Sequence, residues 1–218
     1  MSTNKVPKVI LDDFRVSYVF DVEDPIPEDD LTKALEERGF KVNKQRIITA
    51  PPIRAVLLNL ATYKHTSVMY QKEGIPSFIG AAGKDKRQVL DTFDILQNIL
   101  VNLDPTCLRR SSTIEMVSTT KVFGEKLPEE VIATLASSKV PKFEPIFGSK
   151  MRMVTTSFAS PIEPDKPEWF VRIEPLFRSP RYYFVQLVYR DRRLANVLDI
   201  SQKGEDIIRD VVDALEHD

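Results

Sequence analysis

The amino-acid sequence predicts an α+β protein made of two tandem repeats, each with a strand, a short helix, three or four strands and a long helix. Three observations predict this β-α-β(3-4)-α arrangement. Short runs rich in β-branched and aromatic residues are separated by prolines or polar turns, as strands are. Two long segments carry apolar residues at helical spacing. The same order of elements then occurs twice along the chain, at an interval of about 100 residues.

The first repeat is predicted to span residues 1–103. It opens with a strand in FRVSYVFDV (14–22). A short helix follows in EDPIPEDDLTKALEERGF (23–40), with a proline near its start, three acids in its first turn and Gly39 at its end. Four strand-like runs come next, FKVNKQRIIT, IRAVLLNLAT, TSVMYQ and PSFIGAA. The closing long helix carries apolar residues at spacings of three and four, at Val89, Phe93, Leu96, Leu100 and Leu103.

Residues 104–112 are predicted to be a linker, and residues 113–218 form the second repeat. Its first strand lies in STIEMVSTTKVF and its short helix in LPEEVIATLASS, which again has a proline and two acids at its start. The following strands are predicted in SKMRMVTTSFAS, EWFVRIEPLF and RYYFVQLVYRD, and the closing helix in QKGEDIIRDVVDALEHD (202–218).

Composition narrows the classes of function. The net charge of −1 provides no overall attraction to nucleic acid or to an acidic membrane, although the 31 Lys and Arg residues leave room for a local basic face. Cys107 is the single cysteine, which excludes an internal disulfide and a thiolate metal cluster. The first residues do not read as a signal peptide, and no run approaches the roughly 20 apolar residues of a membrane helix. A cytoplasmic protein without membrane contact is expected.

The segment SFIGAAGKDKRQVLDTFDIL (77–96) resembles the last strand, Gly-Ala turn and long helix of one repeat of the TATA-box-binding-protein-like fold. The element order over 14–103 and 113–216 is similar as well. The resemblance implies a curved antiparallel sheet with helices on one face. The second half departs from it, because VQLVYRDRRLANVLDISQKGEDIIRDVVDAL lacks the Gly-Ala turn and has extra residues before the helix. Two ferredoxin-like halves would produce a similar list of elements.

The resemblance does not carry a function to this chain. DNA-binding members of that family insert paired phenylalanines between base steps, and no such pairs fall at matched positions here. A fold by itself does not imply a function.

The same segment raises the question of a phosphate-binding loop. In GAAGKDK the two glycines, Gly80 and Gly83, are too close for a Walker loop, and Asp85 follows Lys84 where a hydroxyl is needed. The turn is therefore predicted to be structural. The alternative is an anion site at the helix N-terminus, formed by Lys84 and Lys86.

No catalytic or metal-binding set is predicted, and no cofactor is expected. His65 and His217 lack partners at metal-ligand spacing. Cys107 is interpreted as a buried or linker cysteine, the alternative being a thiol whose pKa is lowered by the neighbouring Arg109 and Arg110. The acids of DVEDPIPEDD are interpreted as the first turn of a helix. An enzyme is therefore less expected than a binding protein.

One sheet face is expected to mix arginine, threonine, valine and aromatic residues. Glu115, Val117, Thr119 and Lys121 share one side of their strand. By the same alternation, Arg152 shares one side of its strand with Phe158, and Phe170 shares one side of its strand with Arg172. Such a mixture is typical of sheets that stack on nucleic-acid bases, and equally of half-solvated antiparallel sheets.

The segment FRSPRYYFVQLVYRDRR (177–193) is the densest in basic and aromatic residues. Apolar residues at both odd and even positions of this segment predict a strand that is buried on both faces, with arginines at its ends. The candidate binding residues are Lys121, Arg152, Phe158, Arg172, Arg178, Arg181, Arg190 and Arg192.

Two hypotheses follow. The first is a non-catalytic binding module that uses an open sheet face for nucleic acid or for protein, a second copy of the chain included. The alternative is a small-molecule-binding protein or an unrecognised enzyme with a ligand between the two halves.

Overall fold

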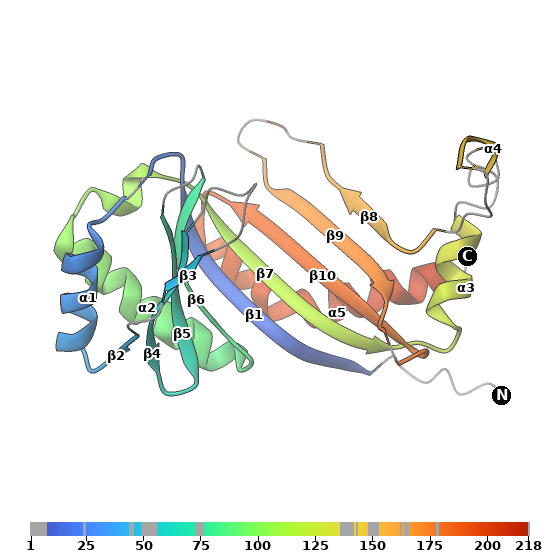
Figure 1. Ribbon diagram of the computed structural model, residues 1–218, viewed down its shortest axis with the longest axis horizontal. Helices are drawn as coiled ribbons and strands as arrows, with labels where there is room; N and C mark the ends of the chain where they lie inside the picture. The colour runs from blue at the N-terminus through green and yellow to red at the C-terminus, as the bar shows by residue number, and fades with distance from the viewer. Residues whose placement is uncertain are drawn as a thin grey trace.

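A computed structural model shows an α+β protein built on one antiparallel sheet (Figure 1). It describes residues 8–23, 25–43, 46–48, 56–72, 76–135, 142, 144–147, 153–161, 163, 166–177 and 179–217. The elements of the first half are β1 (Val9–Phe20), α1 (Glu28–Glu37), β2 (Lys41–Val42), β3 (Arg46–Ile48), β4 (Val56–Tyr63), β5 (Thr66–Lys72), β6 (Ser77–Gly83) and α2 (Lys86–Leu103). A 3₁₀ turn (Cys107–Arg110) leads into the second half. Its elements are β7 (Ser111–Phe123), α3 (Pro128–Leu135), α4 (Glu144–Phe147), β8 (Thr156–Ala159), β9 (Glu168–Pro175), β10 (Tyr182–Asp191) and α5 (Leu194–His217).

The strand order places the two halves side by side in one sheet. Among the described residues the order is β2-β4-β5-β6-β1-β7-β10-β9-β8, β3 also pairs with β4, and every pairing is antiparallel. The first strands of the two halves, β1 and β7, are therefore neighbours. Figure 1 shows that the sheet is curved, since β4, β5 and β6 are seen nearly edge-on while β1, β7 and β10 are seen flat.

The main core lies on the face of the sheet that α2 and α5 cover. Helix α2 packs on β1, β5 and β6, whereas α5 packs on β7 and β10. Alternate residues of β1 enter this core, as the stacked rings of Tyr18 and Phe93, with centroids 5.0 Å apart, illustrate. Burying each such large side chain contributes roughly 1.5–3 kcal/mol to stability. Neither α2 nor α5, nor any shorter helix in the described residues, has an apolar stretch long enough to span a bilayer.

The opposite face of the sheet carries no helix or strand of the described chain, and we call it the open face. The prediction that β10 is buried on both faces was wrong. Tyr183, Val185 and Leu187 are buried towards α5, but Phe184 and Val188, at the alternate positions, are only half-buried. The reason is that helices cover only one side of the sheet, so the apolar residues at the alternate positions of β10 line the open face.

Helix α5 begins at Leu194, eight residues before the predicted start at Gln202. The residues interpreted as an insertion are its first turns, so this prediction was wrong. The buried carboxylate of Asp191 holds the turn, because Oδ1 accepts from the Arg193 backbone N–H (2.8 Å) and Oδ2 from Asn196 Nδ2 (2.6 Å). Local periodicity could not show this start, since the stabilising side chain lies outside the helix.

The Asp191 carboxylate makes stability depend on pH. Burial raises its pKa, but hydrogen bonds from Asn196 and from the Arg193 backbone N–H, together with the Tyr189 hydroxyl at 3.0 Å, lower the pKa below its ordinary value of 3.8. A lowered pKa in the folded state contributes stability that is present above 3.8 and is lost as the pH falls through the folded value. We expect Asp191→Asn to lower the free energy of unfolding by about 1–2 kcal/mol at neutral pH. The melting temperature of this variant should also fall less than that of the wild type as the pH is lowered.

The measurement is the melting temperature between about pH 7 and pH 3. Asp199→Asn is the matched control, because Asp199 lies in α5, the helix that Asp191 precedes, with 52% of its side chain exposed and in an ion pair with Lys203. It should change stability by less than about 0.5 kcal/mol. If the melting temperatures of Asp191→Asn and the wild type fell equally at acid pH, the proposed contribution of the Asp191 carboxylate to the pH dependence of stability would be contradicted.

Candidate functional site

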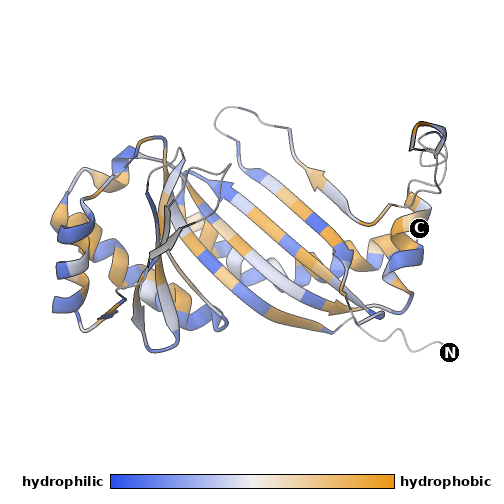
Figure 2. Ribbon diagram, viewed as in Figure 1, coloured by the Kyte–Doolittle hydropathy of each residue, from blue (hydrophilic) through white to orange (hydrophobic). Residues whose placement is uncertain are grey.

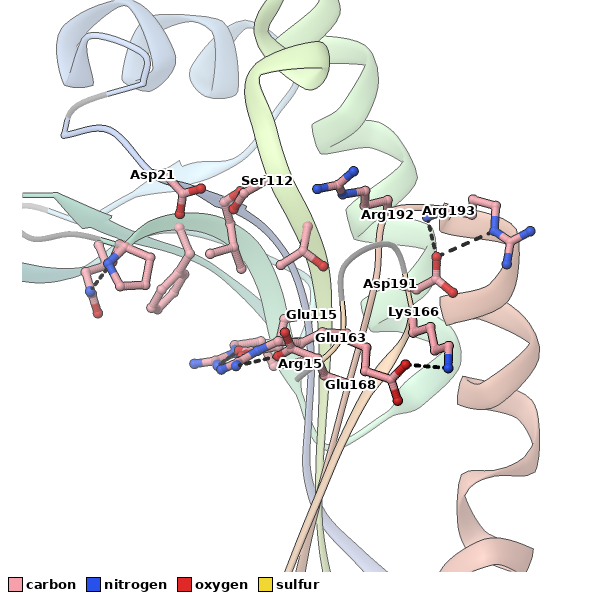
Figure 3. Close-up of a pocket in the computed structure, with 16 residues that line it drawn as sticks. Arg15, Asp21, Ser112, Glu115, Glu163, Lys166, Glu168, Asp191, Arg192 and Arg193 are labelled. Carbon is pink, nitrogen blue, oxygen red and sulfur yellow. Dashed lines mark hydrogen bonds and ion pairs between the residues drawn. The ribbon is translucent and has the colours of Figure 1, made fainter. Parts of the chain in front are cut away.

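A groove of about 940 Å³ lies on the open face where the two halves of the sheet meet (Figure 3). From the first half, Arg15, Val19 and Phe78 line it on β1 and β6. From the second half, Thr113, Glu115 and Arg190 line it on β7 and β10. The groove exists because β1 and β7 pair at the centre of a curved sheet, so that the two halves of the sheet form its converging walls.

Four charged side chains form a ladder across the floor of this groove, which we call the charge ladder: Arg15, Glu115, Arg190 and Glu168, on β1, β7, β10 and β9. The carboxylate of Glu115 is the centre, with only 9% of its side chain exposed. It contacts Arg15 Nη2 on one side and Arg190 on the other, at 2.8 Å from Nε and 2.7 Å from Nη2. A nearly buried carboxylate needs such partners, because desolvation of an unpaired charge is costly.

The two arginines of the ladder differ in how many of their donors are used. All three nitrogens of Arg190 face carboxylates, because Nη1 also lies 3.3 Å from Glu168. Arg15 places Nη2 on Glu115 and its guanidinium over the Phe78 ring, 4.7 Å from the centroid. Within the described residues Arg15 Nε is buried without an acceptor. Arg15 therefore has donor capacity to spare.

The charges at the rim of the groove are largely balanced. Arg193 Nε lies 3.6 Å from Asp191, and Lys166 Nζ lies 2.5 Å from Glu163, as the dashed lines in Figure 3 mark. Arg192 also lines the groove and is labelled above it in Figure 3. The groove is consequently a mixed-charge surface rather than a basic one.

Next to the charge ladder the open face carries a row of apolar residues, Val117, Val188, Phe170 and Ala159, which face one another across β7, β10, β9 and β8. The first three are half-buried. A hollow of about 280 Å³ opens beside Phe170 and Val188. Figure 2 shows the alternation of apolar and polar residues along these strands that produces the row.

The structure places the predicted binding residues in several different positions. Arg190 and Arg192 both line the groove, at the end of β10. Lys121 and Arg172 share the open face but lie outside the groove, and each is paired, Lys121 with Asp12 at 2.8 Å and Arg172 with Glu174 at 2.7 Å. Arg181 lies at the opposite end of β10, where Nη1 is 3.5 Å from the Glu125 carbonyl oxygen. Arg152 and Arg178 lie outside the described residues.

Phe158 does not share a face with the other candidates. The register of β8 on β9 sets Phe158 opposite Val171, on the helix-covered side, whereas Ser157 lies opposite Arg172. Its grouping with the open-face residues was therefore wrong. Strand periodicity shows which residues of one strand share a side, but only pairing with the next strand shows which side that is.

The turn before α2 uses its charged residues for the helix. Asp85 Oδ1 accepts a hydrogen bond from the Gln88 backbone N–H (3.0 Å) and caps α2. Lys86 Nζ lies 3.5 Å from Glu205 on α5, so its charge serves a contact between the helices. Lys84 borders a separate hollow with Asp13 and His65.

Arg15, Phe78, Glu168 and the role of Glu115 were not predicted from the sequence. The one available signal was that Arg15 interrupts an apolar strand, FRVSYVF, on the side opposite its core residues. Cys107, by contrast, is buried, and burial raises the pKa of its thiol although Arg110 opposes this, which argues against a reactive thiolate.

The described part of the chain contains no group of three or more His, Cys, Asp or Glu side chains arranged to hold a metal ion. A comparison with protein-family models and with curated proteins gave no match.

Proposed function

We propose that this protein is a non-catalytic binding module that receives a polypeptide partner on the open face of its curved sheet. The observation that carries the proposal is the combination of a half-buried apolar row with arginines and lysines that are already paired. Protein interfaces have this character, with an apolar centre that is depleted of charged residues and a polar, solvent-accessible rim.

We further propose that the two halves are tandem repeats of a saddle-like fold similar to that of the TATA-box-binding protein. Two features support this. Each half runs strand, short helix, further strands and long helix, although the second half adds the short helix α4, and the strands are arranged as β1-β6-β5-β4 and as β7-β10-β9-β8 on either side of the central β1–β7 pair. Both halves also pass from the last strand to the long helix through two residues, 84–85 and 192–193.

Nucleic acid fits the open face less well than a polypeptide. Binding to a phosphate backbone relies on Lys and Arg side chains that release counterions from the nucleic acid. On this face Lys121, Arg172 and Arg190 each contact a carboxylate, and the chain has a net charge of −1. A phosphate would have to displace these acids against their attraction.

The experiment is selection of a random peptide library displayed on phage against the immobilised protein. We expect enriched peptides whose binding is lost in Val188→Asp, because the carboxylate interrupts the apolar row. Val101→Asp is the matched control, since Val101 lies on α2, away from the open face, and is 39% exposed. Melting curves of both variants check the fold.

Two outcomes would overturn the proposal. One is an equal loss of peptide binding in both valine variants, which would show that binding does not depend specifically on the open face. The other is the absence of any enriched peptide, and salt-sensitive retention of single- or double-stranded DNA or RNA would then favour nucleic acid as the partner.

A small organic ligand in the groove is the second candidate function. The position of the groove between the halves favours it, and about 940 Å³ falls within the range of ligand sites. This function predicts a melting temperature that rises with a member of a metabolite collection. Loss of that rise in Thr113→Trp, which would fill the groove, would assign the ligand to it.

A further inference from the structure

We infer that the corner of the groove formed by Arg15, Glu115 and Phe78 binds an Asp or Glu side chain of the polypeptide partner. The inference rests on the proposed function and names the chemistry that the groove recognises. Four features support it: the free donors of Arg15, the rigidity of its guanidinium, the balance of the charges around it, and its distance from the apolar row.

Arg15 has donors that the protein itself does not use. A guanidinium carries five N–H groups in a planar fork. The hydrogen bonds of Arg15 in the described structure come from Nη2 alone, towards Glu115, and Nε is buried with no acceptor. With 28% of its side chain exposed, Arg15 can meet an incoming carboxylate through its remaining terminal nitrogen.

The guanidinium is held in place before any partner arrives. Glu115 fixes one edge of the fork, and the ring of Phe78 supports one of its faces at 4.7 Å from the centroid. Glu115 is itself fixed by Arg190 from the neighbouring strand. Because this geometry exists in the free protein, less conformational entropy is lost when a carboxylate binds.

The charges around Arg15 are balanced, and Asp13 also interacts electrostatically with Arg15, so a carboxylate is attracted by the unused donors of Arg15 rather than by an excess of positive charge. Glu115 is shared between Arg15 and Arg190, so it does not neutralise Arg15 alone. Two other acids at the groove are paired, Glu168 with Arg190 and Glu163 with Lys166, and Asp21 lines the groove as well. A charge-assisted bond from an arginine fork to a carboxylate, partly shielded from water, is among the strong polar contacts that proteins make.

The strand register places the apolar row beside this corner. Arg15 lies opposite Val117 on β7, which lies opposite Val188 on β10. Adjacent strands are about 4.8 Å apart, so Val188 is roughly 10 Å from Arg15. An extended peptide advances about 3.3 Å per residue. Because successive side chains of an extended segment point to opposite sides, we expect an acidic residue and a large apolar residue two or four positions apart in the bound segment.

The experiment extends the peptide selection. Enriched peptides are synthesised, and their affinities for the wild type, Arg15→Gln, Arg15→Lys and Arg172→Gln are measured by fluorescence polarisation. We expect Arg15→Gln to weaken binding about tenfold or more, and Arg15→Lys to weaken it less, because lysine keeps the charge but not the fork. Arg172→Gln, an arginine variant on the same face, should change affinity less than about twofold.

A double-mutant cycle identifies the partner group. Replacing the acidic residue of the peptide with its amide should weaken binding to the wild type and have little further effect on Arg15→Gln. Arg15→Gln is expected to fold, because Glu115 keeps Arg190 as its partner, and its melting curve checks this.

The outcomes separate this inference from the proposed function. Peptides that depend on Val188 but lack acidic residues, or that bind Arg15→Gln as tightly as the wild type, would overturn the carboxylate site and leave the binding module standing. The absence of enriched peptides would overturn both.

Discussion

Replacing Gly80 with alanine is expected to destabilise the protein by about 3 kcal/mol, because the added methyl group overpacks the sheet next to the groove. A Cβ at this position would lie 2.4 Å from both the Ser17 Cβ and the Val16 carbonyl oxygen, and 2.7 Å from the Ser17 Cα. Most of these atoms belong to the backbone of β1, the strand that pairs with both β6 and β7. Relief would require β1 and β6 to separate where the sheet curves. Urea unfolding followed by circular dichroism measures the loss.

Gly204→Ala is the matched control for this prediction. Gly204 lies within α5, and its added Cβ would meet only Leu187 Cδ2 at an ordinary 3.9 Å. Alanine in a helix interior is expected to stabilise by about 0.5–1 kcal/mol, because glycine loses more backbone entropy on folding. A Gly80→Ala variant as stable as Gly204→Ala would show that the two strands do not approach so closely.

Replacing Glu216 with alanine is expected to cost about 3 kcal/mol as well. This carboxylate, near the end of α5, is 1% exposed and accepts hydrogen bonds from the backbone N–H groups of Glu125 (3.0 Å) and Lys126 (3.1 Å) and from the Tyr183 hydroxyl (2.9 Å). Its removal leaves these three donors without their acceptor. The turn between β7 and α3 should loosen, which amide hydrogen exchange at residues 125–126 would report.

Glu205→Ala is the matched control, since Glu205 lies in the same helix with 45% of its side chain exposed. Its ion pair with Lys86, at 3.5 Å, is expected to contribute less than about 1 kcal/mol. Tyr183→Phe should reproduce part of the Glu216→Ala loss, because it removes one of the three donors. Equal stabilities of the two glutamate variants would contradict a structural role for the buried carboxylate.

The two proposals depend on different parts of the open face. The binding module depends on the apolar row, and the carboxylate site depends on Arg15. Gly80 lies opposite Ser17, two residues from Arg15, so a change in sheet curvature there is expected to weaken peptide binding as well as stability.

Secondary structure was predicted well where its signal is local. The stripe of Val89, Phe93 and Leu96 does face the core from α2, and β7 alternates as expected, with Met116 buried and Val117 half-buried on the open face. The start of α5 was missed, because the Asp191 carboxylate that holds it belongs to the preceding strand. The single covered face of β10 was missed because burial depends on what packs against a strand.

By itself the sequence determined the α+β class, most of the helices and strands, and which residues of a strand share a side. These properties follow from periodicities of two and 3.6 residues, which neighbours along the chain create. Only the tertiary structure decided the candidate site. Glu115 meets Arg15 across 100 residues and Arg190 across 75, and Phe158 falls on the side opposite Arg172. Such contacts depend on strand order and register, which the packing of the whole sheet selects.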